Sequence, residues 1–209
     1  MVIKYGIDRF VWADCVWPLK ILLFVGLLLM TPVIYAGEYQ LDKSKDNQVM
    51  FLSESPLSDF EVITDKIDGY IYWDGGIDLP DSTRYETSDI YFEVQLNSLD
   101  AGNSMYNLHL KEDYLETDKF PYASYKAKIN SITEISDTLF EINLLGDFTV
   151  HGKSKQIEII GLAKKIENGF RIMTDFIITI TDYKIKIPKL LFVEMDDFIK
   201  ISLVFYLKQ

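Results

Sequence analysis

Cysteine is almost absent from this 209-residue sequence, which contains Cys15 and no other. Residues 37–209 can therefore form no disulfide bond, no thiolate metal site and no thiol nucleophile. Cys15 also precedes the apolar run 21–36, whereas the acylated cysteine of a lipoprotein follows such a run. The folded part of the chain must be held together by its core alone.

Histidine and the common catalytic motifs are equally scarce. There are two histidines, and the sequence lacks G-x-S-x-G, H-E-x-x-H and any Gly-rich phosphate loop. Adjacent acids such as Glu112–Asp113 and Asp196–Asp197 point apart on a strand or loop, so we interpret them as solvated surface. Nucleophilic and metal-assisted catalysis both lack a complete set of residues. We expect a non-catalytic protein without a cofactor.

Basic residues are also fewer than acidic ones. The chain has 21 Lys and Arg against 32 Asp and Glu, a net charge of −11 at pH 7. Removing residues 1–36, which hold three basic and two acidic residues, changes the net charge to −12. Such a surface repels nucleic-acid phosphates and anionic membranes. We expect no nucleic-acid partner, and any lipid ligand must be held through apolar contact.

A long apolar run occurs once, at residues 21–36. Lys4, Arg9 and Lys20 come before it and the small residue Ala36 ends it, which is typical of a secretory signal peptide. The run has about 16 residues, short of the ~20 that a membrane-spanning helix needs. We expect cleavage after Ala36, a periplasmic or secreted protein without a stable membrane span, and one domain of residues 37–209. An uncleaved amino-terminal anchor is the alternative.

Alternation of apolar and polar residues recurs along residues 37–209 and is typical of half-buried strands. Ile90, Phe92, Val94 and Leu96, for example, share one face of a predicted strand. The pattern predicts eight strands, at residues 48–53, 60–73, 89–99, 122–130, 137–150, 155–166, 169–181 and 198–208. Because most are consecutive without crossover helices, we expect an all-β, eight-stranded antiparallel barrel, with a two-sheet sandwich as the alternative.

Two inserts interrupt the alternation. Residues 103–114 are predicted to form a short helix, and Pro121 begins the next strand. Residues 182–198 are predicted to form a long loop with an apolar run from Leu190 to Val193. This run is too apolar for an ordinary exposed loop, so we expect it to plug or flank the mouth of the barrel.

Four stretches resemble the YceI-like family of polyisoprenoid-binding periplasmic proteins. They are YQLDKSKDNQVMF (39–51), HLKEDYLETDKFPYASYKAKI (109–129), GDFTVHGKSKQIEI (146–159) and TDYKIKIPKLLFVEMDDFIKISLVFYLK (181–208). The second stretch is similar to the family's histidine, short helix and aromatic-proline segment, and the third to its His-Gly hairpin. The resemblance implies an exported lipocalin-like barrel whose lumen holds a polyisoprenoid, a quinone-like molecule or another long-chain lipid.

The inward faces of the predicted strands supply the candidate binding residues. An eight-stranded barrel leaves an interior that side chains just fill or that holds one small ligand. These residues therefore either line a cavity or pack together as an ordinary core. They are Phe92, Val94, Tyr125, Phe148, Phe176, Ile178, Leu203 and Phe205.

Each histidine has a structural and a functional interpretation. His151 precedes Gly152 where the alternation breaks, which predicts a hairpin corner, with a polar contact at the barrel rim as the alternative. His109 lies in the predicted helix with Glu112 on the same face, which predicts a surface hydrogen bond. Contact of His109 with the polar end of a ligand is the alternative, and a metal site is not expected because only two histidines exist.

We therefore expect an exported protein that binds, sequesters or carries an isoprenoid or similar lipid in its lumen. The first alternative is a structural or stress-response interaction protein with a packed core and no lipid. An enzyme acting at the barrel mouth comes third. Exposed strand edges at an incompletely closed barrel could also support a homodimer.

Overall fold

The computed structural model describes residues 37–53, 59–73, 85, 87–190 and 193–209, with the backbone alone at residues 189, 190, 193 and 194. The chain divides into two units, Met1–Ile34 and Tyr35–Gln209, and all of the described residues belong to the second. The predicted signal segment 1–36 lies outside the described residues, so its cleavage stays a prediction. Within the described part, no helix is both long and apolar enough to cross a membrane.

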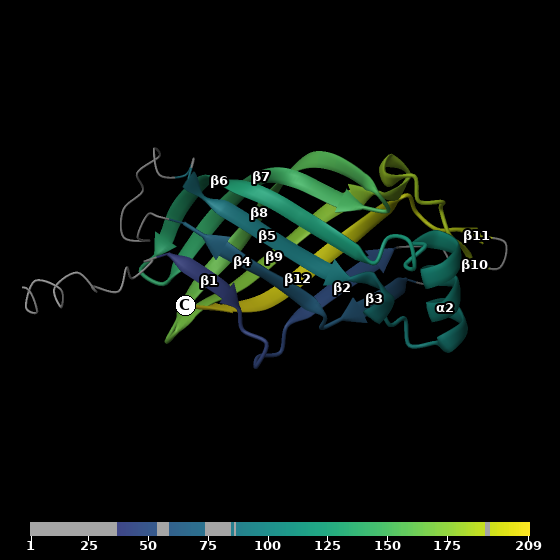
Figure 1. Cartoon of the computed structure of the whole chain (residues 1–209), viewed down its shortest axis with the longest axis horizontal. Helices are drawn as coiled ribbons and strands as arrows, with labels where there is room; N and C mark the ends of the chain where they lie inside the picture. The colour runs from purple at the N-terminus through teal and green to yellow at the C-terminus, as the bar shows by residue number, and fades with distance from the viewer. Residues whose placement is uncertain (1–36, 54–58, 74–84, 86, 191–192) are drawn as a thin grey trace, which may run out of the picture. The chain divides into compact units, whose positions relative to one another are not determined.

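Strands dominate the second unit (Figure 1). The first six of its main sheet are β1 (Glu38–Leu41), β2 (Gln48–Ser53), β3 (Phe60–Thr64), β4 (Ile67–Tyr72), β5 (Asp89–Gln95) and β6 (Tyr122–Ser136). The other four are β7 (Leu139–Val150), β8 (Lys153–Ile166), β9 (Gly169–Thr179) and β12 (Phe198–Lys208). All neighbours are antiparallel, in the order β1-β4-β5-β6-β7-β8-β9-β12-β2-β3.

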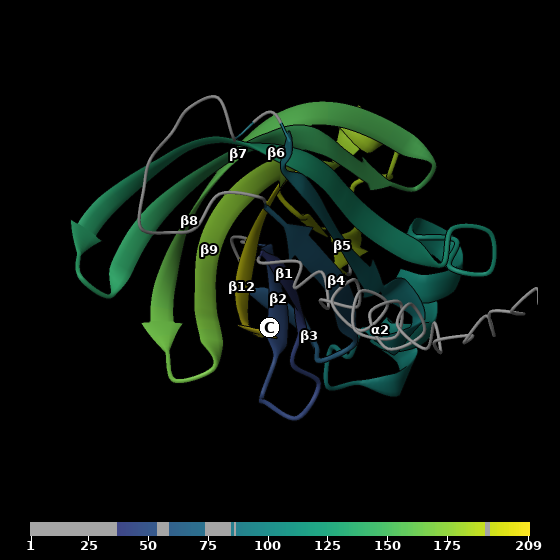
Figure 2. The same cartoon turned by 60° about the vertical axis from the view of Figure 1, so that its left-hand side comes forward.

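An additional pairing between β1 and β12 closes this sheet into a barrel. The short strands β1 and β2 pair with successive parts of β12, and β4 and β3 pair with β1 and β2 in turn. β1 and β2 together therefore act as one strand of the barrel, and β4 and β3 together act as the next. With β5, β6, β7, β8, β9 and β12, the described barrel has eight strand positions, as predicted. Figure 2 shows how β6–β9 curve around one side of it. The homodimer expected through open edges stays a prediction.

The strand predicted over residues 60–73 is wrong in one respect, because β3 ends at Thr64 and β4 begins at Ile67. The side-chain hydroxyl of Thr64 accepts a hydrogen bond from the backbone N–H of Lys66 at 3.0 Å. That N–H is therefore not used for pairing between strands. The carbonyl of Lys66 accepts instead from Gln95 N at 3.0 Å. The alternation also fails to predict β1, which has only four residues.

The predicted helix over 103–114 is confirmed as α2 (Ser104–His109) followed by one π-helical turn, η3 (Leu110–Tyr114). Asn103 caps it, because its side chain accepts from Met105 N at 2.9 Å. Two short 3-10 turns, η2 (Leu96–Ser98) and η4 (Ile180–Tyr183), follow β5 and β9.

The predicted long loop contains one small hairpin, β10 (Lys189–Leu190) paired with β11 (Val193–Glu194). Leu191 and Phe192 lie outside the described residues, as do the side chains of Leu190 and Val193. The predicted role of this run at the barrel mouth is therefore outside what the structure describes.

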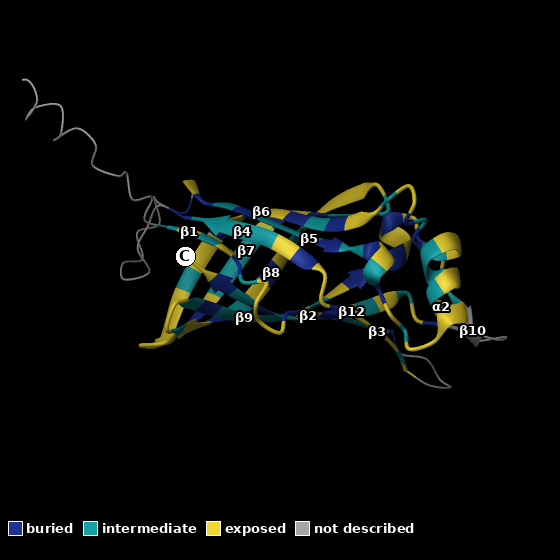
Figure 3. Cartoon of the chain, turned by 60° about the horizontal axis from the view of Figure 1, so that its bottom comes forward, coloured by how far each residue is buried: buried dark blue, intermediate teal, exposed yellow. Residues whose placement is uncertain are grey.

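The two ends of the barrel carry different connections. One end, called here the helix end, carries α2, η4 and the turn at 151–152 between β7 and β8; the other, the hairpin end, carries the turns at 137–138 and 167–168 (Figure 1). Along the strands, buried and exposed residues alternate (Figure 3). On β6, for example, Ala123, Tyr125, Ala127 and Ile129 are buried while Tyr122 and Lys126 are exposed. The predicted inward faces are confirmed.

Gly146 allows β6 and β7 to approach very closely. A Cβ at this position would lie 2.3 Å from the carbonyl oxygen of Lys126 and 2.4 Å from Cβ of Ala127. Backbone atoms cannot move aside as a flexible side chain can. The tight curvature of this part of the barrel therefore requires glycine at residue 146.

Replacing Gly146 with alanine is expected to lower the free energy of unfolding by about 3 kcal/mol, because the added methyl group has no room beside β6. Gly161→Ala is the matched control, since its Cβ would meet its nearest neighbours at an ordinary 3.4 Å. We expect that change to cost less than about 0.5 kcal/mol. Denaturant unfolding of both variants measures the difference, and equal stabilities would contradict the close approach.

Candidate functional site

The interior of the barrel contains an apolar cavity of about 130 Å³, called here the larger cavity. Every one of the eight strand positions contributes to its wall, from Tyr39 on β1 to Leu207 on β12. Among the described residues, none that lines it is charged. Most of the wall is thus built from aliphatic and aromatic side chains, as alternation on a closed sheet requires.

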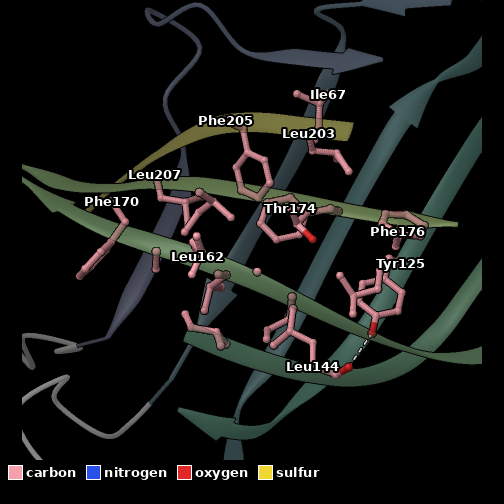
Figure 4. A pocket seen from close by; sticks show the side chains of 18 of the residues that line it. Ile67, Tyr125, Leu144, Leu162, Phe170, Thr174, Phe176, Leu203, Phe205 and Leu207 are labelled. Atoms are coloured by element: carbon pink, nitrogen blue, oxygen red, sulfur yellow. Dashed lines mark hydrogen bonds between the residues drawn. The ribbon is translucent and has the colours of Figure 1, made fainter. Parts of the chain in front are cut away.

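Seven of the eight predicted apolar residues line the larger cavity: Phe92, Val94, Tyr125, Phe148, Phe176, Leu203 and Phe205. Figure 4 shows Tyr125, Phe176, Leu203 and Phe205 around this space. The rings of Phe92 and Phe205 are in contact, with centroids 4.8 Å apart. The eighth residue, Ile178, lies elsewhere. The structure thus brings seven of them together, and their contact with a ligand stays a prediction.

A second apolar space of about 100 Å³, the smaller cavity, lies towards the helix end. Ile178 lines it, together with residues such as Leu96, Leu115 and Ile185. Three residues line both cavities: Phe51, Ala123 and Phe148.

Phe148, which lines both cavities, belongs to an aromatic cluster. Its ring packs edge-on against Phe176, with centroids 5.8 Å apart, and against Tyr183 at 5.5 Å. Such edge-to-face pairs are favourable beyond the area they bury. The wall that the two cavities share therefore includes a ring held by aromatic contacts on both sides.

Two hydroxyl groups of the larger cavity, those of Tyr125 and Thr174, form hydrogen bonds with the backbone. Tyr125 Oη lies 3.2 Å from the carbonyl oxygen of Leu144 and 3.1 Å from that of Ile157 (Figure 4). Thr174 Oγ1 donates to the carbonyl of Ile160 at 2.8 Å. Burial raises the pKa of Tyr125, and the carboxylates of Glu158 and Asp147 raise it further. The phenol is therefore neutral at ordinary pH and serves to satisfy buried carbonyls.

These hydroxyls stand where the β8–β9 ladder ends. The two strands pair from Ile166↔Gly169 to Gly161↔Thr174 and no further, although both continue towards the helix end. The carbonyls of Ile157 and Ile160 therefore lack β9 partners, and Tyr125 and Thr174 supply donors to them.

His151 occupies a hairpin corner, as predicted. His151 and Gly152 have φ values of 51° and 67°, the left-handed region, between the paired residues Val150 and Lys153. His151 lines neither cavity. The sequence therefore placed this residue correctly.

The His151 ring also joins three segments at the helix end. Its Nδ1 lies 3.2 Å from the carbonyl oxygen of Tyr183, its Nε2 lies 3.3 Å from Glu116 Oε1, and its centroid lies 4.8 Å from that of Phe120. The hydrogen bond from Lys119 and then that from His151 lower the pKa of Glu116. His151 thus fastens the corner to the segment before β6 and to η4.

His109 lies on the surface of α2, and its Nδ1 is 2.6 Å from Asp113 Oδ2. The surface hydrogen bond is confirmed, but its partner is one residue beyond the predicted Glu112. Both spacings lie on one helix face, so the sequence could not decide between them. His109 lines neither cavity, and the described residues contain no group of three His, Cys, Asp or Glu arranged to hold a metal.

The candidate set missed the residues at the hairpin end of the larger cavity. Tyr39, Trp73, Phe140 and Phe170 line it there, and the rings of Tyr39 and Phe170 are in contact at 5.3 Å. The alternation could have identified two of them. Phe140 and Phe170 lie on the inward faces of strands that were predicted. The break after Thr64 shifts the alternation before Trp73, and Tyr39 lies on the unpredicted β1.

His151→Ala is expected to lower the free energy of unfolding by about 1–3 kcal/mol, because it removes two hydrogen bonds and the contact with Phe120. His109→Ala is the surface control and should change stability by less than about 0.5 kcal/mol. Thermal or denaturant unfolding measures both. Neither variant should change affinity for an apolar chain much; a loss of more than ~100-fold, about 2.7 kcal/mol, would give that histidine a direct role in binding.

Comparisons with known proteins agree with this architecture. The family model of the YceI-like domain matches residues 39–207 of the sequence. Among solved structures, BcnA of Burkholderia cenocepacia has a TM-score of 0.63 at 15% identity, covering 79% of this chain and 98% of its own. A polyisoprenoid-binding domain from Saccharophagus degradans, implicated in plant cell wall breakdown, has a TM-score of 0.60 at 13% identity, covering 81% and 97%.

A comparison with curated proteins finds no match. The two structural neighbours are too distant in sequence to show more than the fold. The family match, by contrast, runs from β1 almost to the end of β12 and so spans the whole barrel. The chain belongs to the YceI-like family.

Proposed function

We propose that this chain is an exported, non-catalytic protein that binds, sequesters or carries an isoprenoid or similar long apolar lipid in the barrel lumen. One observation carries the proposal: the closed barrel encloses two apolar cavities that share part of their walls. Family membership and the polyisoprenoid-binding name of the Saccharophagus degradans domain support the ligand class. The apolar run 21–36 supports export.

The apolar lining is sufficient to hold such a chain without a charged anchor. Burying one five-carbon unit contributes on the order of 4 kcal/mol gross, at about 0.8 kcal/mol for each methylene. A micromolar dissociation constant needs about 8 kcal/mol. Four or five units give about 16–20 kcal/mol gross, which meets this requirement when ordering the complex costs no more than about 8–12 kcal/mol, within the ~4–15 kcal/mol range of such losses. Affinity should therefore grow with chain length.

The volume of the cavities defines how a chain would fit. The larger cavity, about 130 Å³, is close to the ~150 Å³ of an engineered apolar cavity that binds benzene. It therefore accepts a ring or a short branched unit, whereas a longer chain needs both cavities. Because Phe148 is the bulky side chain of β7 that lines both cavities, we infer that its ring turns aside when a long chain occupies the lumen.

The environment of the polar groups supports a binding role over a catalytic one. The hydroxyls of Tyr125 and Thr174 already donate to backbone carbonyls. Both histidines lie outside the lining of the two cavities. General acid–base chemistry requires a titratable group within hydrogen-bond reach of the substrate, and neither histidine is positioned for that in the lumen.

Native mass spectrometry of the exported protein is expected to reveal a co-purifying apolar ligand of several hundred daltons, because the lumen would otherwise lose contact energy around its cavities. Addition of a polyprenol to delipidated protein should restore the same mass shift. A consistently bare chain that also rejects added polyprenol and quinone would favour the alternative, an interaction protein with no physiological lipid.

Ala123→Leu is expected to weaken binding of a long chain at least tenfold, about 1.4 kcal/mol, because Ala123 lies at the junction of the two cavities. Lys126→Leu is the matched control, since Lys126 is exposed on the outer face of the same strand. Calorimetric titration with polyprenols of increasing length measures both variants. Unchanged affinity of the Ala123 variant for every length would show that chains do not cross this junction.

A further inference from the structure

The wall of the barrel changes character between β8 and β9. Their common ladder ends at Gly161↔Thr174, although both strands continue towards the helix end. Residues 153–160 of β8 stay paired with β7, and residues 175–179 of β9 stay paired with β12. These two described stretches therefore face each other without a shared ladder. The boundary between them is called here the split.

The split begins at the wall of the larger cavity. Gly161 and Thr174, where the ladder ends, both line this cavity. Ile159 on one side of the split and Phe176 on the other line it as well. The hydroxyl of Thr174 donates to the carbonyl of Ile160 at 2.8 Å, so a side chain rather than a backbone N–H of β9 satisfies the first carbonyl beyond the ladder. The split and the lumen are thus adjacent.

Side chains rather than backbone hydrogen bonds hold the two sides of the split together. The ring of Phe148 on β7 contacts that of Phe176 on β9, with centroids 5.8 Å apart. Because β8 lies between β7 and β9 in the sheet, this contact passes along the inner face of β8. At the helix end, Lys155 on β8 pairs with Asp182 in η4 at 2.6 Å and so bounds the split. Both partners are partly exposed, and such surface pairs contribute little.

The split is the part of this wall that opens with the least loss of hydrogen bonds. Parting β7 from β8 would break a ladder that runs along both strands, and the ladder between β9 and β12 is equally complete. Backbone groups left without partners in an apolar interior are costly. Between residues 153–160 and 175–179, by contrast, the structure describes no ladder to break. Opening requires side chains to turn while the strands keep their other partners.

The outer face offers apolar contact on both sides of the split. Ile160 on β8 is 50% exposed and Ile177 on β9 is 65% exposed. Ile159 and Ile178, next to them in sequence, are buried, so the exposed pair lies on the outer face. A hydrocarbon chain that reaches the wall here would contact apolar side chains outside the barrel before it meets those of the lumen.

We propose that an apolar chain enters and leaves the lumen sideways, through the split between β8 and β9. This inference rests on the proposed lipid-binding function and adds the route that a ligand takes. The rings of Phe148 and Phe176 part to admit the chain. The ladder that ends at Thr174 and the ion pair of Lys155 with Asp182 limit the opening at its two ends.

Cross-linking the two strands tests this route, because Cys15 is the only cysteine and can be replaced by serine. Continuing the register of the ladder places Glu158 opposite Ile177, and both are exposed. In the full chain with Cys15→Ser, Glu158→Cys and Ile177→Cys, a short bis-maleimide joins the two strands across the split. The same chain with both thiols capped by N-ethylmaleimide is the reference.

The linked chain should take up and release a fluorescent conjugated-polyene chain at least about tenfold more slowly than the capped chain. The dissociation constant should change by less than about 2-fold, because a route affects both rates equally and neither residue lines a cavity. Stopped-flow fluorescence measures the rates. A link between Ile160→Cys and Asp175→Cys, the first positions beyond the ladder, closes the same split and should have the same effect.

Two further links locate the effect. Lys164→Cys with Arg171→Cys joins the same strands inside their ladder. Phe60→Cys with Tyr106→Cys joins β3 to α2 at the helix end, where the two rings are in contact at 5.9 Å. Each should leave the uptake rate within about 2-fold of its capped form.

The outcomes separate this inference from the proposed function. Slower exchange in the chains linked across the split alone supports the sideways route. If exchange slows only with the link at the helix end, with every link or with none, the chain enters elsewhere, so the route fails and lipid binding stands. If neither the polyene nor an added polyprenol binds the unlinked chain by native mass spectrometry, the proposed function fails, and the route fails with it.

Discussion

The closure of the sheet between β1 and β12 is the constraint on which the rest of the structure depends. It consists of two residue pairs, Gln40↔Lys208 and Leu41↔Leu207, and the chain leaves the ladder after Asp42, whose N–H donates to the carbonyl of Tyr206 at 2.8 Å. The side chain of Asn47 takes the place of a backbone partner here. Its Oδ1 accepts from Tyr206 N at 2.9 Å, and its Nδ2 donates to the carbonyl of Asp42. With the ladder restored at β2, the sheet keeps its apolar face inside and needs no second layer to cover it.

Closure also explains why inward side chains contact one another across the barrel while cavities remain between them. An eight-stranded barrel is just wide enough for its inward side chains to meet, as Phe92 and Phe205 do at 4.8 Å. Gly146 draws β6 against β7, whereas β8 and β9 part beyond Gly161. Strands that converge in one place and diverge in another cannot be filled evenly by side chains. The cavities are therefore a consequence of the curvature, and a ligand recovers the contacts that the wall lacks.

Local pattern predicted most of the fold, and long-range contacts account for what it missed. Alternation identified the eight strand positions and the inward faces, because successive side chains of a strand point to opposite faces of the sheet, and only one face of a closed sheet is buried. It could not show that Thr64 interrupts a strand by binding the N–H of Lys66. It located His151 at its corner but not its contacts with Glu116 and Tyr183, which lie more than thirty residues away along the chain. Cavity volume is a small difference between large packed volumes, so no pattern of residue types could supply it.

The two ends of the barrel are held together by different interactions. At the helix end, ion pairing of Lys155 with Asp182 at 2.6 Å and the His151 contacts hold η4 against the β7–β8 corner. The described wall there is apolar, with the flexible hydroxyl of Ser53. At the hairpin end, aromatic side chains line the larger cavity, where the rings of Tyr39 and Phe170 are in contact at 5.3 Å. One end of the lumen is therefore bounded by connections that polar contacts hold in place, and the other by packed aromatic rings, so the two ends resist a bound chain through different kinds of contact.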